Sequence, residues 1–271
     1  MTNLDTSPVP DYLRMLRLDG KGYVIIGGGQ GIGRQAAHAL RQAGAKVAIV
    51  GRSKEMTEAT AAEVKGFAIL GDATKRVDMQ RIFAEASDKL GGVHGIVDTL
   101  GQVCRKPIVA ATDEDIAWQY DIVLRHALLA TQIGGPMIAA NGGGTITFVG
   151  SVSGITWLSN HGLYGTSKAA LHQLVRAAAM ELAEQKVRVN IVTPNVVQTP
   201  RVKGYMDSGR GARAIDYYPL GRLATPADVA SAILYLSTDL SSYVTGQMLL
   251  VDSGMTIQNP MPESVWFEEG E

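Results

Sequence analysis

Short apolar runs and helical patterns alternate along almost the whole sequence. The apolar runs lack the polar alternation of half-exposed strands, which indicates strands buried on both faces. Strict alternation of strand and helix predicts right-handed crossovers and a parallel sheet of about seven strands, in an α/β domain with helices on both faces. The expected strands are 23–26, 46–50, 67–70, 93–97, 144–149, 187–192 and 247–251, and the expected helices are 32–43, 54–65, 75–90, 113–133, 162–185 and 226–237.

No linker rich in Pro or Ser interrupts residues 20–255, so a single domain is expected at 18–257. Residues 1–17 are predicted to be a polar N-terminal extension, and residues 258–271 a C-terminal tail. Residues 198–218 are rich in Gly, Arg and Tyr and lack periodicity. Because a long irregular segment in a compact α/β domain is usually a binding loop, we expect a substrate lid there.

Charge and composition exclude several classes of protein. A formal net charge of −1 provides no basic excess for nucleic-acid binding. No run approaches the roughly 20 apolar residues of a membrane span. The single cysteine, Cys104, fits a reducing compartment, and residues 1–20 carry acids and prolines instead of a secretory signal. We therefore expect a cytoplasmic protein without a nucleic-acid partner, a membrane partner or a metal site.

A glycine-rich turn follows the first expected strand and opens the first expected helix. Glycine permits tight turns and a close approach of the backbone, and a helix N-terminus offers free N–H groups to a phosphate. Since a strand precedes this turn and a helix follows it, the pattern favours a dinucleotide site in a doubly wound, Rossmann-type domain. The residues assigned to this site are Gly27, Gly29, Gln30, Gly31, Ile32 and Gly33.

The end of the second strand indicates which nicotinamide cofactor is bound. An acidic residue there would bond the ribose hydroxyls and repel a 2′-phosphate, but this chain has Gly51 followed by Arg52 and Ser53. A guanidinium favours phosphate, so NADP(H) is expected, with NAD(H) as the alternative if Arg52 is only a solvated charge. Asp72 and Ala73, just after the third strand, are placed beside the adenine.

Tyr164 and Lys168 form the candidate reaction centre. Their spacing of four puts phenol and ammonium on one face of an expected helix. A nearby ammonium favours the phenolate, so we expect Lys168 to pull the pKa of Tyr164 down toward working pH. Ser151 follows the strand 144–149 at its carboxyl end, where open α/β sheets bind ligands. Its hydroxyl is expected to hold the substrate oxygen.

Together these features resemble the short-chain dehydrogenase/reductase family over about residues 18–255. The resemblance covers the form of the family with a Tyr-x-x-x-Lys active site. It rests on the glycine turn, on the set Ser151, Tyr164 and Lys168, and on two further motifs. These are Val187-Arg188-Val189-Asn190 before Pro194, and the ending from Thr245-Gly246-Gln247 to Asp252-Ser253-Gly254.

The resemblance implies a role for each matching residue. Ser151 would orient the carbonyl, Tyr164 would act as general acid/base, and Lys168 would also bond the nicotinamide ribose. Val197 and Thr199 would hold the carboxamide. The motif that includes Leu100 and Gly101 would line the cofactor floor. The family usually forms dimers or tetramers through its two long central helices, so a homodimer or homotetramer is expected, paired through 113–133 and 162–185.

The chain departs from the family pattern at three places. The family's Asn-Asn-Ala-Gly after the fourth strand is replaced by Asp98-Thr99-Leu100-Gly101, and Ile26 replaces the usual Thr before the glycine turn. The family's catalytic Asn falls on Val123. Valine can neither donate nor accept a hydrogen bond. A proton relay through this position must therefore run differently or slowly.

The sequence favours an oxidoreductase that interconverts a ketone and a secondary alcohol by hydride transfer. A nucleotide-binding or regulatory protein without turnover is the alternative, supported by Val123 and Asp98-Thr99 but opposed by the intact catalytic set. An epimerase or dehydratase is disfavoured because no second substrate domain follows residue 255. Tyr205, Met206, Tyr217, Tyr218 and Trp157 indicate a hydrophobic or cyclic substrate.

Overall fold

The computed structural model describes residues 7–259, which form one sheet covered by helices on both faces. The strands are β1 (Gly22–Ile26), β2 (Lys46–Gly51), β3 (Phe67–Leu70), β4 (Gly95–Asp98), β5 (Gly144–Val149), β6 (Val187–Pro194) and β7 (Met248–Val251). All neighbouring strands are parallel, in the order β3-β2-β1-β4-β5-β6-β7. The order reverses between β1 and β4, so a ligand crevice is expected beyond their carboxyl ends. The predicted doubly wound fold is confirmed.

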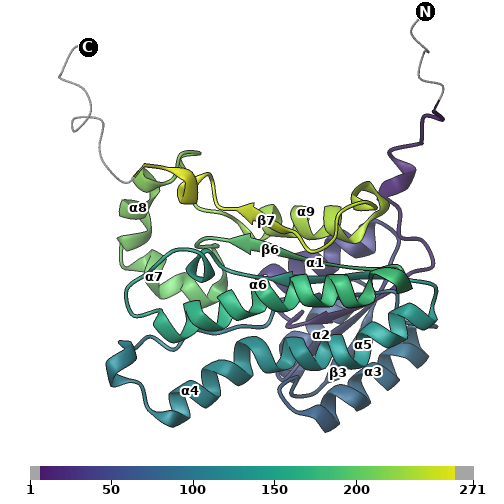
Figure 1. The fold of residues 1–271 in the computed structure, drawn as a ribbon, viewed down its shortest axis with the longest axis horizontal. Helices are drawn as coiled ribbons and strands as arrows, with labels where there is room; N and C mark the ends of the chain where they lie inside the picture. Colours follow the sequence, from purple (N-terminus) through teal and green to yellow (C-terminus); the bar gives the residue numbers. More distant parts are fainter. Residues whose placement is uncertain (1–6, 260–271) are drawn as a thin grey trace, which may run out of the picture.

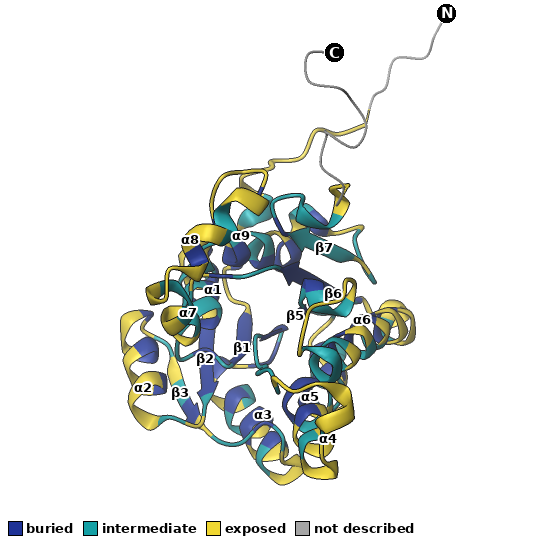
Figure 2. Ribbon diagram, turned by 90° about the vertical axis from the view of Figure 1, so that its left-hand side faces the viewer, coloured by how far each residue is buried: buried dark blue, intermediate teal, exposed yellow. Residues whose placement is uncertain are grey.

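The main helices are α1 (Gly31–Gln42), α2 (Lys54–Glu63), α3 (Arg76–Leu90), α4 (Asp113–Tyr120), α5 (His126–Ala140), α6 (Gly162–Leu182) and α9 (Pro226–Ser237). Each lies within a few residues of a predicted helix, except that the helix expected to end at 133 continues through Pro136 to Ala140. Figure 1 shows α4 and α5 following one another along one face of the molecule, with α6 running beside them. Figure 2 shows that the helices turn exposed faces outward, away from the buried strands.

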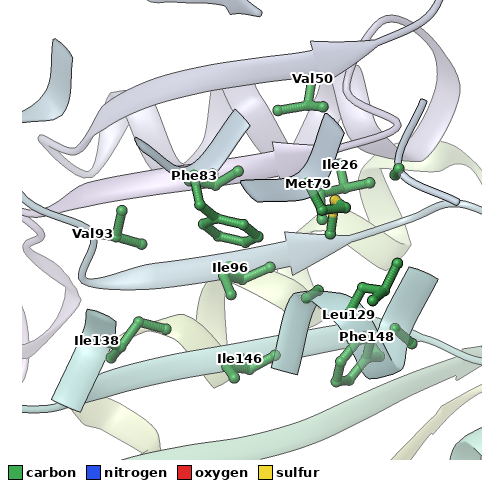
Figure 3. Close-up of a cluster of buried hydrophobic side chains, with 14 of the residues drawn as sticks. Ile26, Val50, Met79, Phe83, Val93, Ile96, Leu129, Ile138, Ile146 and Phe148 are labelled. Carbon is green, nitrogen blue, oxygen red and sulfur yellow. The ribbon is translucent and has the colours of Figure 1, made fainter. Parts of the chain in front are cut away.

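Successive side chains of each strand enter two separate cores. Ile26 and Val50 join Phe83 of α3 and Ile138 of α5 on one face of the sheet (Figure 3). Their neighbours Ile25 and Ile49 pack on the opposite face with residues of α1, α2 and α9. The strands thus bury both faces, as the unbroken apolar runs predict.

The segment 198–218 is not the irregular loop that its lack of periodicity suggests. It contains the short helices α7 (Lys203–Asp207) and α8 (Arg210–Ala214), flanked by 3₁₀ turns. In Figure 1 these helices stand at one end of the domain, beside the N-terminal end of α6. In the N-terminal extension a 3₁₀ turn occupies Arg14–Leu16, and the proposed tail 258–271 lies almost entirely outside the described residues.

Candidate active site

The glycine turn after β1 forms a cradle that side chains would fill. Gly27 and Gly31 adopt positive φ, 77° and 55°, in the left-handed region that favours glycine. A Cβ at Gly33 would collide with the carbonyl oxygen of Gly27 and lie 2.8 Å from the Cα of Gly28. No side chain caps the N-terminus of α1 at Gln30. The backbone therefore presents a helix N-terminus that suits a diphosphate.

The outer side of the cradle is fixed by α2 and by the core. The Thr60 hydroxyl donates to the carbonyl oxygen of Gly29 at 3.1 Å. A Cβ on Gly29 would lie 3.2 Å from Cβ of Met56, so α2 closes over this glycine. Ile32, at the start of α1, packs against the core that contains Ile25 and Ile49. These contacts position the turn before any cofactor binds.

The turn after β2 places one unpaired guanidinium near the cradle. A Cβ on Gly51 would lie 2.6 Å from the Thr57 hydroxyl, so α2 leaves no room for an acidic side chain there. Ser53 caps α2 by accepting from the amide of Met56 at 3.4 Å. Arg52 is exposed, and no hydrogen bond or ion pair of its side chain is seen among residues 7–259. Arg34 of α1, a second guanidinium that follows the glycine turn, is instead held by Glu63 at 2.7 Å.

The turn after β3 is rigid because Asp72 organises it. Its Oδ1 accepts from the amide of Thr74 at 3.0 Å and from the Thr74 hydroxyl at 2.8 Å. Its own amide donates to Asp78 at 2.7 Å. Ala73 is buried between them. One carboxylate oxygen of Asp72 has no hydrogen bond among the described residues, so it can still accept from an adenine amino group.

The loop after β4 lies between the glycine turn and the catalytic helix. The Thr99 hydroxyl donates to the carbonyl oxygens of Ile26 and Gly27 at 3.0 and 3.2 Å, which joins this loop to the cradle. The amide of Leu100 donates to Asp98 at 3.0 Å. A Cβ on Gly101 would lie 3.3 Å from Nζ of Lys168. The replacement residues thus still secure the loop and bring it to the lysine.

Ser151, Tyr164 and Lys168 converge beyond the carboxyl end of β5. Nζ of Lys168 donates to the carbonyl oxygen of Val149, the last residue of β5, at 2.7 Å. It lies 5.7 Å from the centre of the Tyr164 ring. The Ser151 hydroxyl accepts from the amide of Ser153 at 3.2 Å and also interacts with the Tyr164 phenol. One strand end and one helix therefore bring the three predicted catalytic side chains together.

The pKa values of the pair differ from the sequence-based expectation. Burial raises the pKa of Tyr164 to about 12, although Ser151 and the guanidinium of Arg201 act in the opposite direction. Burial also lowers the pKa of Lys168 to about 8, against the charge of Asp98, which raises it. The expectation that Lys168 pulls the phenol pKa down is wrong for this structure, because burial dominates at both groups. At neutral pH the phenol is protonated, as a general acid must be.

Arg201 is a residue of this site that the sequence analysis missed. It lies in the 3₁₀ turn Pro200–Val202 near the start of the segment 198–218, and its Nη1 donates to the carbonyl oxygen of Gly101 at 2.8 Å. Burial and the charge of Arg52 lower the pKa of Arg201, so the two guanidinium groups repel each other. An anion between them would relieve that repulsion. Only the fold brings these groups near one another, and no sequence spacing signals it.

The two residues expected to hold the carboxamide lie at the N-terminal end of the segment 198–218. Val197 is buried and forms a parallel bridge with Ala224. The methyl group of Thr199 lies 3.1 Å from the position of a Cβ on Gly31. The segment 198–218 therefore starts beside the glycine turn.

Val123 lies inside a π-helical turn, Asp121–Arg125, between α4 and α5. Its side chain is fully buried. We expect Val123→Asn to bury an unpaired amide and to destabilise the fold by about 1–3 kcal/mol without raising kcat. Urea denaturation measures the loss of stability, and steady-state kinetics at neutral pH measure kcat. Val77→Asn, at an exposed position of α3, should change neither. A several-fold gain in kcat with unchanged stability would contradict this prediction.

Two further features of the domain are a cavity and a long apolar helical run. A cavity of about 590 Å³ opens at the amino ends of the strands, lined among others by Arg17, Tyr23 and Arg188. The helical run Asp113–Ala140 is long and apolar enough to cross a membrane by composition alone. Half of the most apolar 18-residue stretch of this run is buried inside the domain, as in a helix that covers a sheet. Among residues 7–259 no cluster of three His, Cys, Asp or Glu side chains could hold a metal ion.

Comparison with known proteins matches nearly the whole chain. A family model described as enoyl-(acyl carrier protein) reductase matches residues 27–256. A tropinone reductase homologue of Arabidopsis thaliana is 34% identical over 89% of this chain and 94% of its own length. Carbonyl reductase family member 4 of Danio rerio is 32% identical over 86% of this chain and 97% of its own length.

Two solved structures share the fold. A 7α-hydroxysteroid dehydrogenase complexed with NADH and 7-oxo glycochenodeoxycholic acid superposes with a TM-score of 0.86 at 30% identity, over 90% of this chain and 98% of that one. A short-chain type dehydrogenase/reductase from Mycobacterium marinum superposes with a TM-score of 0.86 at 31% identity. The match covers 92% of this chain and 100% of that one.

The chain belongs to the short-chain dehydrogenase/reductase family. It is an oxidoreductase that acts on CH–OH or carbonyl groups, and its family uses NAD(P)(H). The relatives are named as reductases and dehydrogenases, which opposes the alternative of a nucleotide-binding protein without turnover.

Proposed function

We propose that this enzyme interconverts a hydrophobic or cyclic ketone and the corresponding secondary alcohol, with Ser151, Tyr164 and Lys168 as its catalytic residues. The observation that carries the proposal is the convergence of these three side chains beyond the carboxyl end of β5, next to the Gly101 loop. The cradle at Gly27 and Gly31 fits a dinucleotide, because only glycine leaves its backbone accessible there.

Each catalytic side chain has a separate task in reduction. The bound nicotinamide cofactor supplies the hydride. Ser151 donates a hydrogen bond to the substrate carbonyl oxygen and holds it beside Tyr164. The phenol of Tyr164 is protonated at neutral pH, and burial raises its pKa further. It gives its proton to the oxygen as negative charge develops there. The ammonium of Lys168 stabilises the resulting phenolate. In oxidation the same groups act in reverse.

The substrate proposal is supported by the relatives and by the lid. One solved relative holds a 7-oxo bile acid, which is a polycyclic ketone, and other relatives are named for tropinone or carbonyl reduction. Tyr205 and Met206 are half-buried in the lid. A panel of aliphatic, alicyclic and steroid ketones with NADPH and NADH tests this proposal through the loss of reduced-nicotinamide absorbance. The absence of turnover with every ketone of the panel would reject it.

The preferred cofactor is proposed to be NADP(H). A charge-assisted contact from Arg52 contributes about 1.5–3 kcal/mol, so NADP(H) should exceed NAD(H) by about tenfold or more in kcat/KM. Arg52→Ala should remove most of that preference and leave the NAD(H) kinetics nearly unchanged. Lys54→Ala, which removes an exposed charge two residues away, is the control and should keep the preference. A wild-type enzyme that works as well with NAD(H) would show that Arg52 is only a surface charge.

The assembly is proposed to be a homodimer or homotetramer built on the long central helices. Ile116 and Trp118 of α4 are exposed in the single chain, as is Met180 of α6. These helices lie next to each other, so pairing would bury apolar side chains that otherwise face water. Light scattering on the purified enzyme tests this, and a monomer at micromolar concentration would contradict it. A cytoplasmic location stays a proposal.

A further inference from the structure

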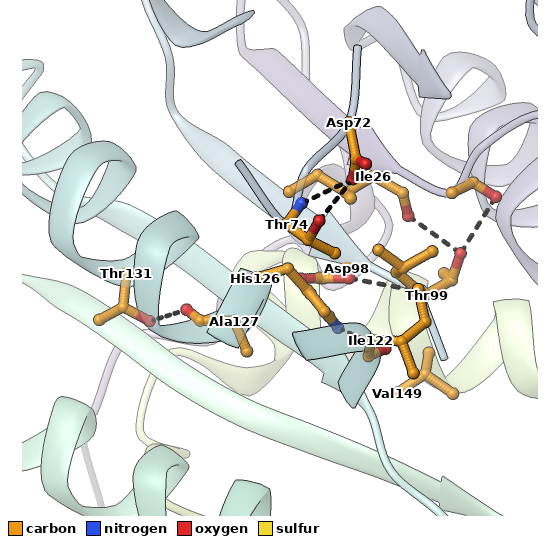
Figure 4. A network of polar contacts seen from close by, with 12 residues as sticks. Ile26, Asp72, Thr74, Asp98, Thr99, Ile122, His126, Ala127, Thr131 and Val149 are labelled. Atoms are coloured by element: carbon orange, nitrogen blue, oxygen red, sulfur yellow. Dashed lines mark hydrogen bonds and ion pairs between the residues drawn. The ribbon is translucent and has the colours of Figure 1, made fainter. Parts of the chain in front are cut away.

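A buried acid–base pair lies behind the catalytic lysine, outside the proposed catalytic set. Asp98 ends β4 and is 2% exposed, and His126 begins α5 and is 1% exposed. Nδ1 of His126 lies 2.8 Å from Oδ2 of Asp98, and Nε2 lies 3.1 Å from the carbonyl oxygen of Ile122 (Figure 4). The second carboxylate oxygen of Asp98 accepts from the amide of Leu100.

The partners of the ring determine how many protons the pair holds. The Ile122 carbonyl can only accept, so Nε2 must carry a proton. Nδ1 faces a carboxylate, so the second proton lies between Nδ1 and Oδ2. With this proton on the ring, the pair is an imidazolium and a carboxylate, which is the arrangement that satisfies both oxygens of Asp98 as acceptors. A singly protonated ring beside an ionised Asp98 would leave a lone pair facing either the Ile122 carbonyl or the carboxylate.

The carboxylate of this pair acts on Lys168. In the sheet Asp98 pairs with Phe148 of β5, the residue before Val149, whose carbonyl oxygen accepts from Nζ of Lys168. The Gly101 backbone, in the loop that follows Asp98, also approaches Nζ. Asp98 is the acidic group whose charge raises the pKa of Lys168 among the described residues, while burial lowers it. The other titratable groups on this side are Tyr164 and His172 of α6, the ring of His126 behind Asp98, and Arg201, which donates to the Gly101 carbonyl oxygen. Burial and the charge of Lys168 lower the pKa of His172 to about 4. His172 is therefore neutral at neutral pH.

The π-helical turn explains why a histidine can take this place. A π turn inserts an extra residue into a helix and shifts the side chains that follow it. Val123, where the family has its catalytic Asn, is fully buried in the turn and offers no polar group. Three residues further on, His126 reaches Asp98 across to β4. The polar group of this helix is thus displaced from position 123 to position 126.

We propose that Asp98 and His126 act together as positioning residues that keep the Lys168 ammonium charged beside Tyr164, in place of the amide that is missing at position 123. His126 holds Asp98 ionised and oriented, and Asp98 supplies the negative charge. This inference rests on the proposed catalytic role of Lys168.

The test is the pH profile of kcat with a ketone accepted from the panel. Activity requires the charged lysine and falls as the pH rises through the pKa of Lys168. Asp98→Asn keeps the shape of the side chain and its acceptor for Leu100 but removes the charge, so it lowers the pKa of Lys168. The basic limb of the profile should move to lower pH by about one unit or more. Asp88→Asn, an exposed carboxylate of α3, should leave the profile unchanged.

Variants of the histidine separate positioning from folding. His126→Leu removes the donor to Asp98 and should shift the basic limb in the same direction as Asp98→Asn. His126→Gln can still donate to Asp98 and should restore most of the wild-type profile. An unshifted profile in both Asp98→Asn and His126→Leu would overturn the inference. Lys168→Met should abolish activity in any case. If it does not, the proposed catalytic set fails, which is a different result.

A measurement on the wild-type enzyme covers the case in which these variants do not fold. Nitrogen chemical shifts of ¹⁵N-labelled histidine should show one ring, assigned to His126, with both nitrogens protonated at neutral pH. A His126 ring with one unprotonated nitrogen would overturn the inference.

Discussion

Tyr164→Phe is expected to lower kcat by at least about 10²-fold, the low end for the loss of a general acid–base group. The phenol is the proton donor in the proposed mechanism, and its raised pKa keeps it protonated at neutral pH. Phenylalanine keeps the ring, including the edge-on contact with His161 at 6.2 Å between ring centres. The fold and the cofactor site should therefore be unchanged. Steady-state kinetics measure kcat, and fluorescence titration measures the dissociation constant of the cofactor.

Tyr243→Phe is the matched control for this variant. Tyr243 is fully exposed, far from the described catalytic residues in sequence, and also loses only a hydroxyl group. Its kcat should equal that of the wild type. If Tyr164→Phe retained most of the wild-type kcat, the proton would have another donor and the assignment of Tyr164 would be wrong.

Phe83→Ala is expected to reduce the free energy of unfolding by about 3–5 kcal/mol, because it leaves a cavity in the core. Phe83 is fully buried on α3 and packs in the cluster between the sheet, α3 and α5 (Figure 3). α5 approaches so closely that a Cβ on Gly134 would lie 2.7 Å from the Phe83 ring. The backbone around the ring is thus tightly packed and can collapse only partly into the cavity. Urea denaturation measures the loss.

Val77→Ala is the control on the same helix. Val77 is 78% exposed, so its truncation should change stability by no more than about 0.5 kcal/mol. Gly134→Ala should be destabilising in the wild type and less so in the Phe83→Ala background, where part of the space is free. Equal effects of Gly134→Ala in both backgrounds, or a Phe83→Ala variant as stable as the wild type, would contradict this description of the core.

Much of the fold could be predicted because it follows from local periodicity. The strands 67–70 and 144–149 are found with the expected bounds, and the others differ by one or two residues. Gly134, Gly135 and Pro136, which follow the expected helix end at 133, are residues with low helix propensity. The helix continues to Ala140 because its buried face packs against the sheet, and tertiary packing outweighs weak helix propensity.

The sequence by itself determined the components of the candidate site. The glycine turn, the spacing of Tyr164 and Lys168 and the place of Ser151 after an apolar strand are local patterns. Each is read within a few residues, and parallel strands bring their carboxyl ends to one edge of the sheet. Family membership follows from these patterns in register, and the comparisons confirm it.

Only the tertiary structure decided how these components interact. The Asp98–His126 pair joins residues 28 positions apart, and Arg201 reaches Gly101 across 100 positions. Neither pairing leaves a periodic signal in the sequence. The pKa of Tyr164 depends on how deeply the fold buries the phenol, and burial reverses the shift that its spacing from Lys168 predicts. Spacing along a helix places two groups on one face, whereas their solvation and their distant partners depend on how the whole chain packs.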